Sequence, residues 1–194
     1  MRRSFLTMIL VGALLVAPAT GAAATGTTTA GATAIGTTAT GATAAAAPYC
    51  GITWGSQPRT VAGMSTAQVA GVRTGRHSCF DRLVIDVNGD AGGYTVRYVK
   101  HVRHDASGKI IPTKGGAALQ LTVNDPGDTY RPAHPTNLSD VTGYRTFRQV
   151  VFAGAFEGYT SFGLGVRARL PFRVFVLDGP GTGSRVVVDV AHQW

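Results

Sequence analysis

The hexapeptide RLVIDV runs from Arg82 to Val87, and the similar hexapeptide RVVVDV runs from Arg185 to Val190. In an extended strand, successive side chains point to opposite faces. Each copy therefore has one fully apolar face and one face on which a valine lies between an arginine and an aspartate. Two strands of the same design would suit the two pseudo-symmetric halves of a β-sandwich, as after an internal duplication. Chance similarity is the alternative, because β-rich proteins use Val and Ile constantly.

The chain beyond Pro48 has the same strand-like character throughout. Apolar residues alternate with polar ones or form short continuous runs, and turn residues separate these runs. This pattern predicts an all-β sandwich or barrel of about eight strands. A loop that leads into a strand is favoured over a helical turn at residues 65–72. Strands are expected near residues 69–74, 80–88, 94–103, 117–123, 145–152, 159–167, 171–177 and 185–191.

One connection in this pattern is unusually long. Residues 124–143, NDPGDTYRPAHPTNLSDVTG, have neither strand nor helix periodicity. Irregular connections of this length are uncommon in compact domains, and they are either functional or merely mobile.

The N-terminal part of the chain has the composition of an export signal and a tether. Two arginines, an apolar run and three alanines predict a signal peptide over residues 1–24. The apolar run is too short for a transmembrane span, so none is expected in the mature form. The RRSFLT opening fits either Sec or twin-arginine export. Residues 25–47 are nearly all Thr, Ala and Gly, which predicts a disordered linker, either an envelope spacer or a tolerated tail.

Residues 48–194 are then expected to form one folded domain, and its two cysteines indicate an oxidising compartment. Cys50 and Cys79 lie beyond the expected signal peptide. An even number of cysteines in an exported chain predicts a disulfide. Closing a loop of about 30 residues would stabilise the fold by roughly 3–4 kcal/mol on the chain-entropy model. Free thiols, or a nucleophilic Cys79 beside His77, are the alternatives.

The net charge of the chain indicates which class of binding partner to expect. The chain has a formal net charge of +8, and most of its basic residues are arginine. A positive field favours anionic partners. However, the sequence has no long basic run, no recognition-helix pattern and no interleaving of aromatic and basic residues, so nucleic acid is not expected as a partner.

The sequence has no persuasive catalytic or metal-binding pattern. An open zinc site needs His and Glu ligands, but Glu157 is the only glutamate. His101 and His104 are three residues apart in an expected strand, so they should point to opposite faces. The glycine-rich stretch 179–184 is typical of a β-turn, and no nucleophile elbow is present. We therefore expect a protein that is not an enzyme and that has no metal site and no cofactor.

Several longer motifs resemble a known family. The C-terminal half contains FEG, FGLGVR and RLPFRVF in succession, followed by SRVVVDVAH, and the first half contains VRTGRHSCFDRLVIDV and GGAALQLTV. Over about residues 69–192 these motifs resemble the AMIN-like domain of exported bacterial proteins, which is related to the AMIN domain of cell-wall amidases and secretins. The resemblance implies a β-sandwich of two roughly symmetric sheets. It also implies a module that localises its partner by binding peptidoglycan or other envelope components, although no catalytic or pore domain is expected beside it here.

Candidate ligand-binding residues follow from the charge pattern. Arginine suits bidentate contact with carboxylates, which wall peptides and anionic wall polymers contain. Glu157 could accept hydrogen bonds from a ligand, or could pair with Arg167 or Arg169. These two arginines share a face of an expected strand, and they could instead extend the basic group of Arg73, Arg76 and His77. The strand aromatics could stack on sugars but are more typical of a core. The candidates are Arg73, Arg76, His77, Glu157, Arg167 and Arg169, and the aromatics are Tyr94, Tyr98, Tyr159 and Phe162.

Together these features predict a secreted or cell-wall-associated, extracytoplasmic module without catalytic activity. Its expected partner is peptidoglycan or another anionic envelope polymer. The alternative is an exported module that docks on another envelope protein, and a third hypothesis is a hydrolase with an unrecognised motif.

Overall fold

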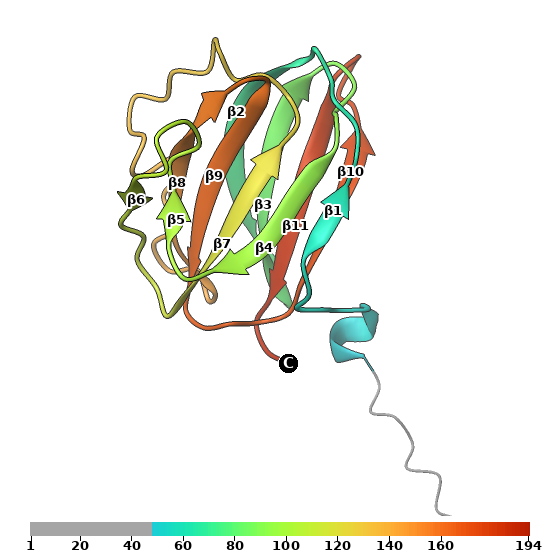
Figure 1. Ribbon diagram of the computed structural model, residues 1–194. Helices are drawn as coiled ribbons and strands as arrows, with labels where there is room; N and C mark the ends of the chain where they lie inside the picture. The colour runs from blue at the N-terminus through green and yellow to red at the C-terminus, as the bar shows by residue number, and fades with distance from the viewer. Residues whose placement is uncertain (1–47) are drawn as a thin grey trace, which may run out of the picture. The chain divides into compact units, whose positions relative to one another are not determined.

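The structure is a computed structural model that describes residues 48–194. The expected signal peptide and linker lie outside the described residues. The described part consists of one short 3-10 helix and eleven strands (Figure 1). Their bounds are η1 Tyr49–Gly51, β1 Arg59–Val61, β2 Gln68–Arg76, β3 Phe80–Asn88, β4 Tyr94–Val99, β5 Val102–Arg103, β6 Ile110–Ile111, β7 Ala117–Val123, β8 Phe147–Phe156, β9 Tyr159–Val166, β10 Phe172–Asp178 and β11 Ser184–Ala191.

Every strand expected from the sequence is present. The expected strand at 94–103 is divided into β4 and β5, because the chain leaves the sheet after Val99. As favoured, residues 65–67 form a loop before β2. The strands that the pattern did not predict, β1 and β6, have three and two residues. Segments of that length are too short to show a period of two.

Two antiparallel sheets pack face to face as a β-sandwich, which confirms the expected fold (Figure 1). One sheet has five strands in the order β1-β4-β7-β9-β8, and the other has four in the order β10-β11-β3-β2. Alternate side chains of the long strands fill the space between the sheets, whereas the three residues of β1 are exposed. In β7, for example, Leu119, Leu121 and Val123 are completely buried. The largest fully buried side chains are Phe147, Phe162 and Phe172.

The two hexapeptides lie side by side in one sheet, as parts of β3 and β11. Their antiparallel register places Arg82 opposite Asp189 and Asp86 opposite Arg185. The interpretation that they belong to two separate halves of the sandwich was therefore wrong. A strand with arginine at one end and aspartate at the other is complementary to an antiparallel copy of itself, because opposite charges then face each other across the ladder.

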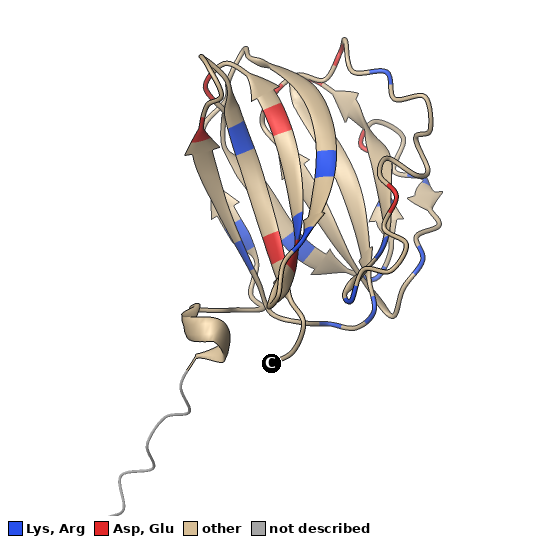
Figure 2. Cartoon of the chain, turned by 180° about the vertical axis from the view of Figure 1, so that it is seen from behind, with Lys and Arg blue, Asp and Glu red and all other residues tan. Residues whose placement is uncertain are grey.

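Ion pairs join the polar faces of these strands on the outer surface of the four-stranded sheet (Figure 2). The Arg82 guanidinium donates to both carboxylate oxygens of Asp189, at 2.6 and 2.9 Å. Arg173 of β10 donates to the same carboxylate at 2.8 Å. In the other copy, Asp86 accepts two hydrogen bonds from Arg73 of β2, at 2.8 and 3.0 Å. The side chains of these ion pairs thus lie across the outer face of the four-stranded sheet.

Glycines in β9 allow a second layer on the outer face of the five-stranded sheet. In FGLGVR, Phe162, Leu164 and Val166 point into the core, so the two glycines point outward. A Cβ on Gly163 would lie 2.7 Å from the side chain of Val102 in β5, and one on Gly165 would clash with the carbonyl oxygen of Lys114. These glycines let the β5–β6 hairpin and the chain after it lie directly on the sheet.

The long irregular connection closes the seam between the edge strands β2 and β8. The amide of Val69 in β2 donates to the carbonyl of Pro126 at 2.8 Å, and the amide of Phe152 in β8 donates to the carbonyl of Pro135 at 2.7 Å. Leu138 donates to the carbonyl of Val150 at 2.9 Å. Backbone hydrogen bonds to both sheets therefore fix this connection in place.

The predicted disulfide between Cys50 and Cys79 is present, with a Cα–Cα distance of 6.4 Å. It ties the segment that contains η1 to the turn before β3. Among residues 48–194, no helix has the length and apolar character needed to cross a membrane.

Candidate functional site

Cationic side chains gather at one end of the sandwich. At this end β2 is followed by β3 and β9 by β10, and the disulfide lies here too (Figure 1). Figure 2 shows Lys and Arg positions along the loops of this end, whereas most loop acids lie elsewhere. We call this surface the basic end. Its residues are Arg76, His77, Lys100, Lys114, Arg145, Arg148, Arg167 and Arg169.

The cations of the basic end have no carboxylate partner. Within residues 48–194, the salt bridges join Asp86 to Arg73, Asp189 to Arg82 and Arg173, and Asp81 to His192. All of the arginines in these pairs lie on the outer face of the four-stranded sheet. The charge of the basic end is therefore available to an external anion.

Two predicted site residues, Arg76 and His77, lie at the end of β2 and in the following turn. The Arg76 guanidinium lies 5.8 Å from the centre of the Tyr144 ring. The His77 ring stacks on Phe80 at 4.5 Å. Both side chains are exposed, so packing against an aromatic ring orients them without burying them.

Arg167 and Arg169 also lie at the basic end, but they do not share a strand face. β9 ends at Val166, so both arginines belong to the β9–β10 connection. The Arg167 guanidinium donates to the carbonyl of His192. Arg169 instead lies over the Tyr98 ring, 4.7 Å from its centre. The expectation of a shared face was wrong because the strand ends one residue before Arg167.

The other two predicted residues lie away from the basic end. Arg73 is on the outer face of β2, where its hydrogen bonds to Asp86 raise the pKa of the guanidinium. Glu157 lies in the β8–β9 turn, at the opposite end of the sandwich. β9 separates it from Arg167, and a strand of eight residues spans roughly 26 Å. The expected pairing of Glu157 with Arg167 or Arg169 was therefore wrong.

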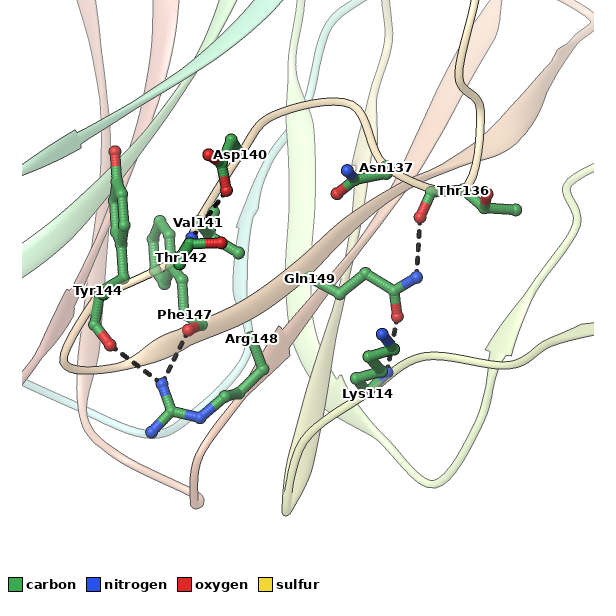
Figure 3. A pocket seen from close by; sticks show the side chains of 11 residues that line it. Lys114, Thr136, Asn137, Asp140, Val141, Thr142, Tyr144, Phe147, Arg148 and Gln149 are labelled. Carbon is green, nitrogen blue, oxygen red and sulfur yellow. Dashed lines mark hydrogen bonds between the residues drawn. The ribbon is translucent and has the colours of Figure 1, made fainter.

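An open cleft of about 730 Å³ adjoins the basic end (Figure 3). One wall is the last part of the long connection, residues 136–144, and the other is the beginning of β8. Lys114 contributes from the outer layer. The cleft thus has two cations, Lys114 and Arg148, and one carboxylate, that of Asp140.

Hydrogen bonds fix both walls of the cleft. The Gln149 side chain joins them, since its Oε1 accepts from the Lys114 amide and its Nε2 donates to the Thr136 carbonyl, both at 2.7 Å (Figure 3). The Arg148 guanidinium donates to the carbonyls of Tyr144 at 3.1 Å and Phe147 at 2.8 Å. These contacts fix the positions of the two walls relative to each other.

Contacts within the protein also fix the side chains of Tyr144 and Asp140. The Tyr144 ring is parallel to that of Phe147, and its hydroxyl donates to the Thr74 hydroxyl at 2.9 Å. The carboxylate of Asp140 accepts from the Thr142 amide at 2.9 Å. This hydrogen bond lowers the pKa of Asp140, so the carboxylate is ionised at neutral pH.

Sequence reasoning missed the residues of this cleft. Its one signal was the length of the 124–143 connection, which indicated either function or mobility. The contributions of Lys114 and Gln149 depend on contacts across the sheet, which no local pattern reveals.

A buried acid–histidine pair lies beneath the basic end. His192 Nε2 is 3.2 Å from Asp81 Oδ1, and the other oxygen of Asp81 accepts from the amides of Thr146 at 2.6 Å and Phe147 at 3.1 Å. Both side chains are at most 2% exposed, so a substrate cannot reach them. The pair joins β3, β8 and the segment after β11. In the part of the chain that the structure describes, no three His, Cys, Asp or Glu side chains could hold a metal ion together.

The aromatic candidates divide between core and surface. Tyr94 and Phe162 are buried in the core, and Tyr98 is half-buried, with its hydroxyl donating to the Leu170 carbonyl at 2.6 Å. Burial raises the pKa of Tyr98. Tyr159 is exposed beside Glu157, at the opposite end from the cleft.

Comparison with known proteins identifies one family. A family model of the AMIN-like domain matches residues 67–192, which is more than half of the chain. The match agrees with the resemblance over residues 69–192 noted above. No curated protein and no solved structure matches the chain.

Proposed function

Because this chain belongs to the AMIN-like domain family, we propose that it is an extracytoplasmic module that associates with an anionic polymer of the cell wall, peptidoglycan foremost. The observation that supports this proposal is the basic end, where exposed cations without carboxylate partners lie together. The disulfide supports a location outside the reducing cytosol.

The chemistry of the wall suits this surface. Wall peptides and anionic wall polymers have repeated carboxylates or phosphates, and arginine binds such groups through two parallel hydrogen bonds. Each exposed contact is weak on its own. A polymer that engages several cations at once gains avidity, because the later contacts form at high effective concentration.

Sedimentation with purified peptidoglycan tests the proposal. The protein should sediment with the wall at low salt, and less of it should sediment at high salt, because salt screens exposed charges. A variant with Arg76→Ala, Arg145→Ala and Arg169→Ala should lose most of this retention. If the protein does not sediment at low salt, the proposal is wrong.

A matched control separates the basic end from net charge. Arg59, Arg97 and Arg103 are exposed arginines of the five-stranded sheet and the outer layer. Replacing these three with alanine removes the same charge, but should leave retention nearly unchanged. Equal losses in the two variants would show that the wall responds to overall charge and not to the basic end.

The proposed association involves no reaction. The structure supports this part because the described Asp–His pair is closed to substrate, and because the cleft beside the basic end has a single carboxylate. Incubation with purified wall should therefore release neither new reducing ends nor free amines. Release of either product would indicate a hydrolase.

A second candidate function is docking on another envelope protein, and the end opposite the basic end favours it. Glu157 and Gly158 form a two-residue turn with φ angles of 50° and 82°. This turn leaves Phe156 47% and Tyr159 39% exposed, beside Met64 at 55%. Exposed apolar clusters mark protein interaction sites. Cross-linking in intact cells should then yield one dominant protein partner, which Phe156→Ser with Tyr159→Ser should abolish.

A further inference from the structure

We infer that the cleft of Figure 3 binds a short peptide that has both a carboxylate and a free amine. Stem peptides of peptidoglycan that contain a diamino acid with a free side-chain amine have this combination. The inference rests on the proposed wall association and adds to it a defined ligand and a defined site. A general anionic polymer would need only the cations of the basic end.

The distribution of charge in the cleft supports this ligand. Lys114 and Arg148 line the cleft, and neither has a carboxylate partner within the described residues. Asp140 lines the same cleft and is also without a cationic partner there. An anion alone would leave Asp140 as a repulsive group. A peptide with an ammonium group and a carboxylate matches both signs of charge.

The neutral groups suit a peptide backbone. Asn137, Thr142 and Gln149 line the cleft with neutral polar side chains. Val141 and Phe147 are buried below them and give the cleft an apolar base. A few placed polar groups above an apolar base are typical of small-ligand sites, which occupy about 300–1,000 Å³.

Hydrogen bonds also order the walls of the cleft. Gln149 joins its two walls, Arg148 holds the chain between Tyr144 and Phe147, and Ser139 forms a 2.7 Å hydrogen bond with Thr74 of β2. A site that is already ordered loses little conformational entropy on binding. This is why a short, flexible peptide can bind there measurably.

Calorimetric titration with two synthetic peptides tests the inference. The first probe is the tetrapeptide Ala-γ-Glu-Lys-Ala with its N-terminal α-amine acetylated, so that the lysine ε-amine is its one free amine, and the second is the same peptide acetylated on the ε-amine as well. The first should bind to the purified protein, and acetylation should weaken binding about fivefold, as expected for loss of one partly exposed charge pair. Asp140→Asn retains the hydrogen bond to Thr142. This variant should weaken binding of the first peptide by the same factor.

The two changes must also be non-additive. If the amine binds at Asp140, acetylation should have no further effect in Asp140→Asn. Lys114→Gln should weaken the binding of both peptides by the same factor, because it removes a partner of the peptide carboxylate. Lys109→Gln and Asp128→Asn change exposed charges outside the cleft and should have no effect.

The outcomes separate this inference from the proposed function. If neither peptide binds while the protein still sediments with whole peptidoglycan, the cleft is not the site and the basic end alone accounts for wall binding. If acetylation and Asp140→Asn act additively, the amine binds elsewhere and the inference is wrong. If the peptide binds but the wall does not retain the protein, the cleft recognises free peptide and the proposed wall association is wrong.

Discussion

At the scale of single residues, the two hexapeptides show how one short sequence produces two different environments. Asp189 is completely buried between Arg82 and Arg173, whose side chains are 23% and 32% exposed. Asp86 is 29% exposed and pairs with Arg73, which is 54% exposed. The difference arises from the neighbouring strands, because β11 lies between β10 and β3, whereas β3 is flanked by the edge strand β2.

Alanine at these two positions should therefore have unequal effects. Asp189→Ala removes the partner of two half-buried arginines and should lower the free energy of unfolding by about 3 kcal/mol. Asp86→Ala breaks an exposed ion pair and should lower the free energy of unfolding by less than about 1 kcal/mol. Urea denaturation of both variants measures the difference. Equal losses would mean that the burial of Asp189 has no energetic consequence.

Asp125 provides a residue-scale prediction on pH. Its side chain is buried, one carboxylate oxygen accepts from the Gly92 amide at 2.8 Å, and the other has no hydrogen-bond partner. Burial raises the pKa of this carboxyl. The folded protein therefore holds this proton more tightly than the unfolded chain does, so its stabilising effect is complete below the ordinary Asp pKa and is lost as the pH rises through the raised value.

Asp125→Asn keeps the acceptor for Gly92 and removes the titration. The free energy of unfolding of the variant, relative to the wild type, should therefore rise as the pH increases above the ordinary Asp pKa of about 4. Denaturation at several pH values measures this trend. A difference that stays constant, or that falls with pH, would contradict it.

At the scale of elements, periodicity predicted the long strands because each has one face in the core. The β5–β6 layer was not predicted as a separate layer. Its strands are very short, and the layer can lie on the sheet only because Gly163 and Gly165 of β9 have no side chains. The glycines are visible in the sequence. The segments that pack against these glycines are far away in the chain, so no local sequence pattern indicates the contact.

Gly165→Ala tests this account of the outer layer. The added Cβ would clash with the backbone of Lys114, which cannot rotate away as a side chain could. We expect a loss of about 1–3 kcal/mol in the free energy of unfolding, as for other overpacked sites. Gly71→Ala in β2 is the matched control, because the nearest atom to its added Cβ would be 4.0 Å away. A similar loss in both variants would show that loss of glycine, and not the clash, is responsible.

At the scale of the whole molecule, the sequence predicted the sandwich, the disulfide and the family, because each depends on composition, short patterns or motifs. It did not predict the cleft, and it left open whether Arg167 and Arg169 would join the basic group of Arg76 and His77 or face Glu157. Arg76 and Arg167 could each be placed near the end of a strand, but only the strand order shows that these ends coincide. The pairing of β3 with β11 likewise joins residues 107 positions apart, as in Arg82 and Asp189.

The separation of charge along the sandwich predicts how the protein is oriented on the wall. The chain has three lysines, Lys100, Lys109 and Lys114, which serve as built-in probes. Lys100 and Lys114 belong to the basic end. Lys109 lies in the β5–β6 turn, where its carbonyl accepts from the amide of His104, and the His104 ring packs over Gly154 near the far end of β8.

Amine acetylation followed by mass spectrometry measures this orientation. When the protein is bound to peptidoglycan at low salt, Lys100 and Lys114 should react several times more slowly than in the free protein, because the polymer covers them. Lys109 should react at its free rate, which makes it an internal control in every sample. Protection of Lys109 equal to that of Lys100 would mean that the polymer lies along a face of the sandwich. The basic end would then be only one part of a more extended contact.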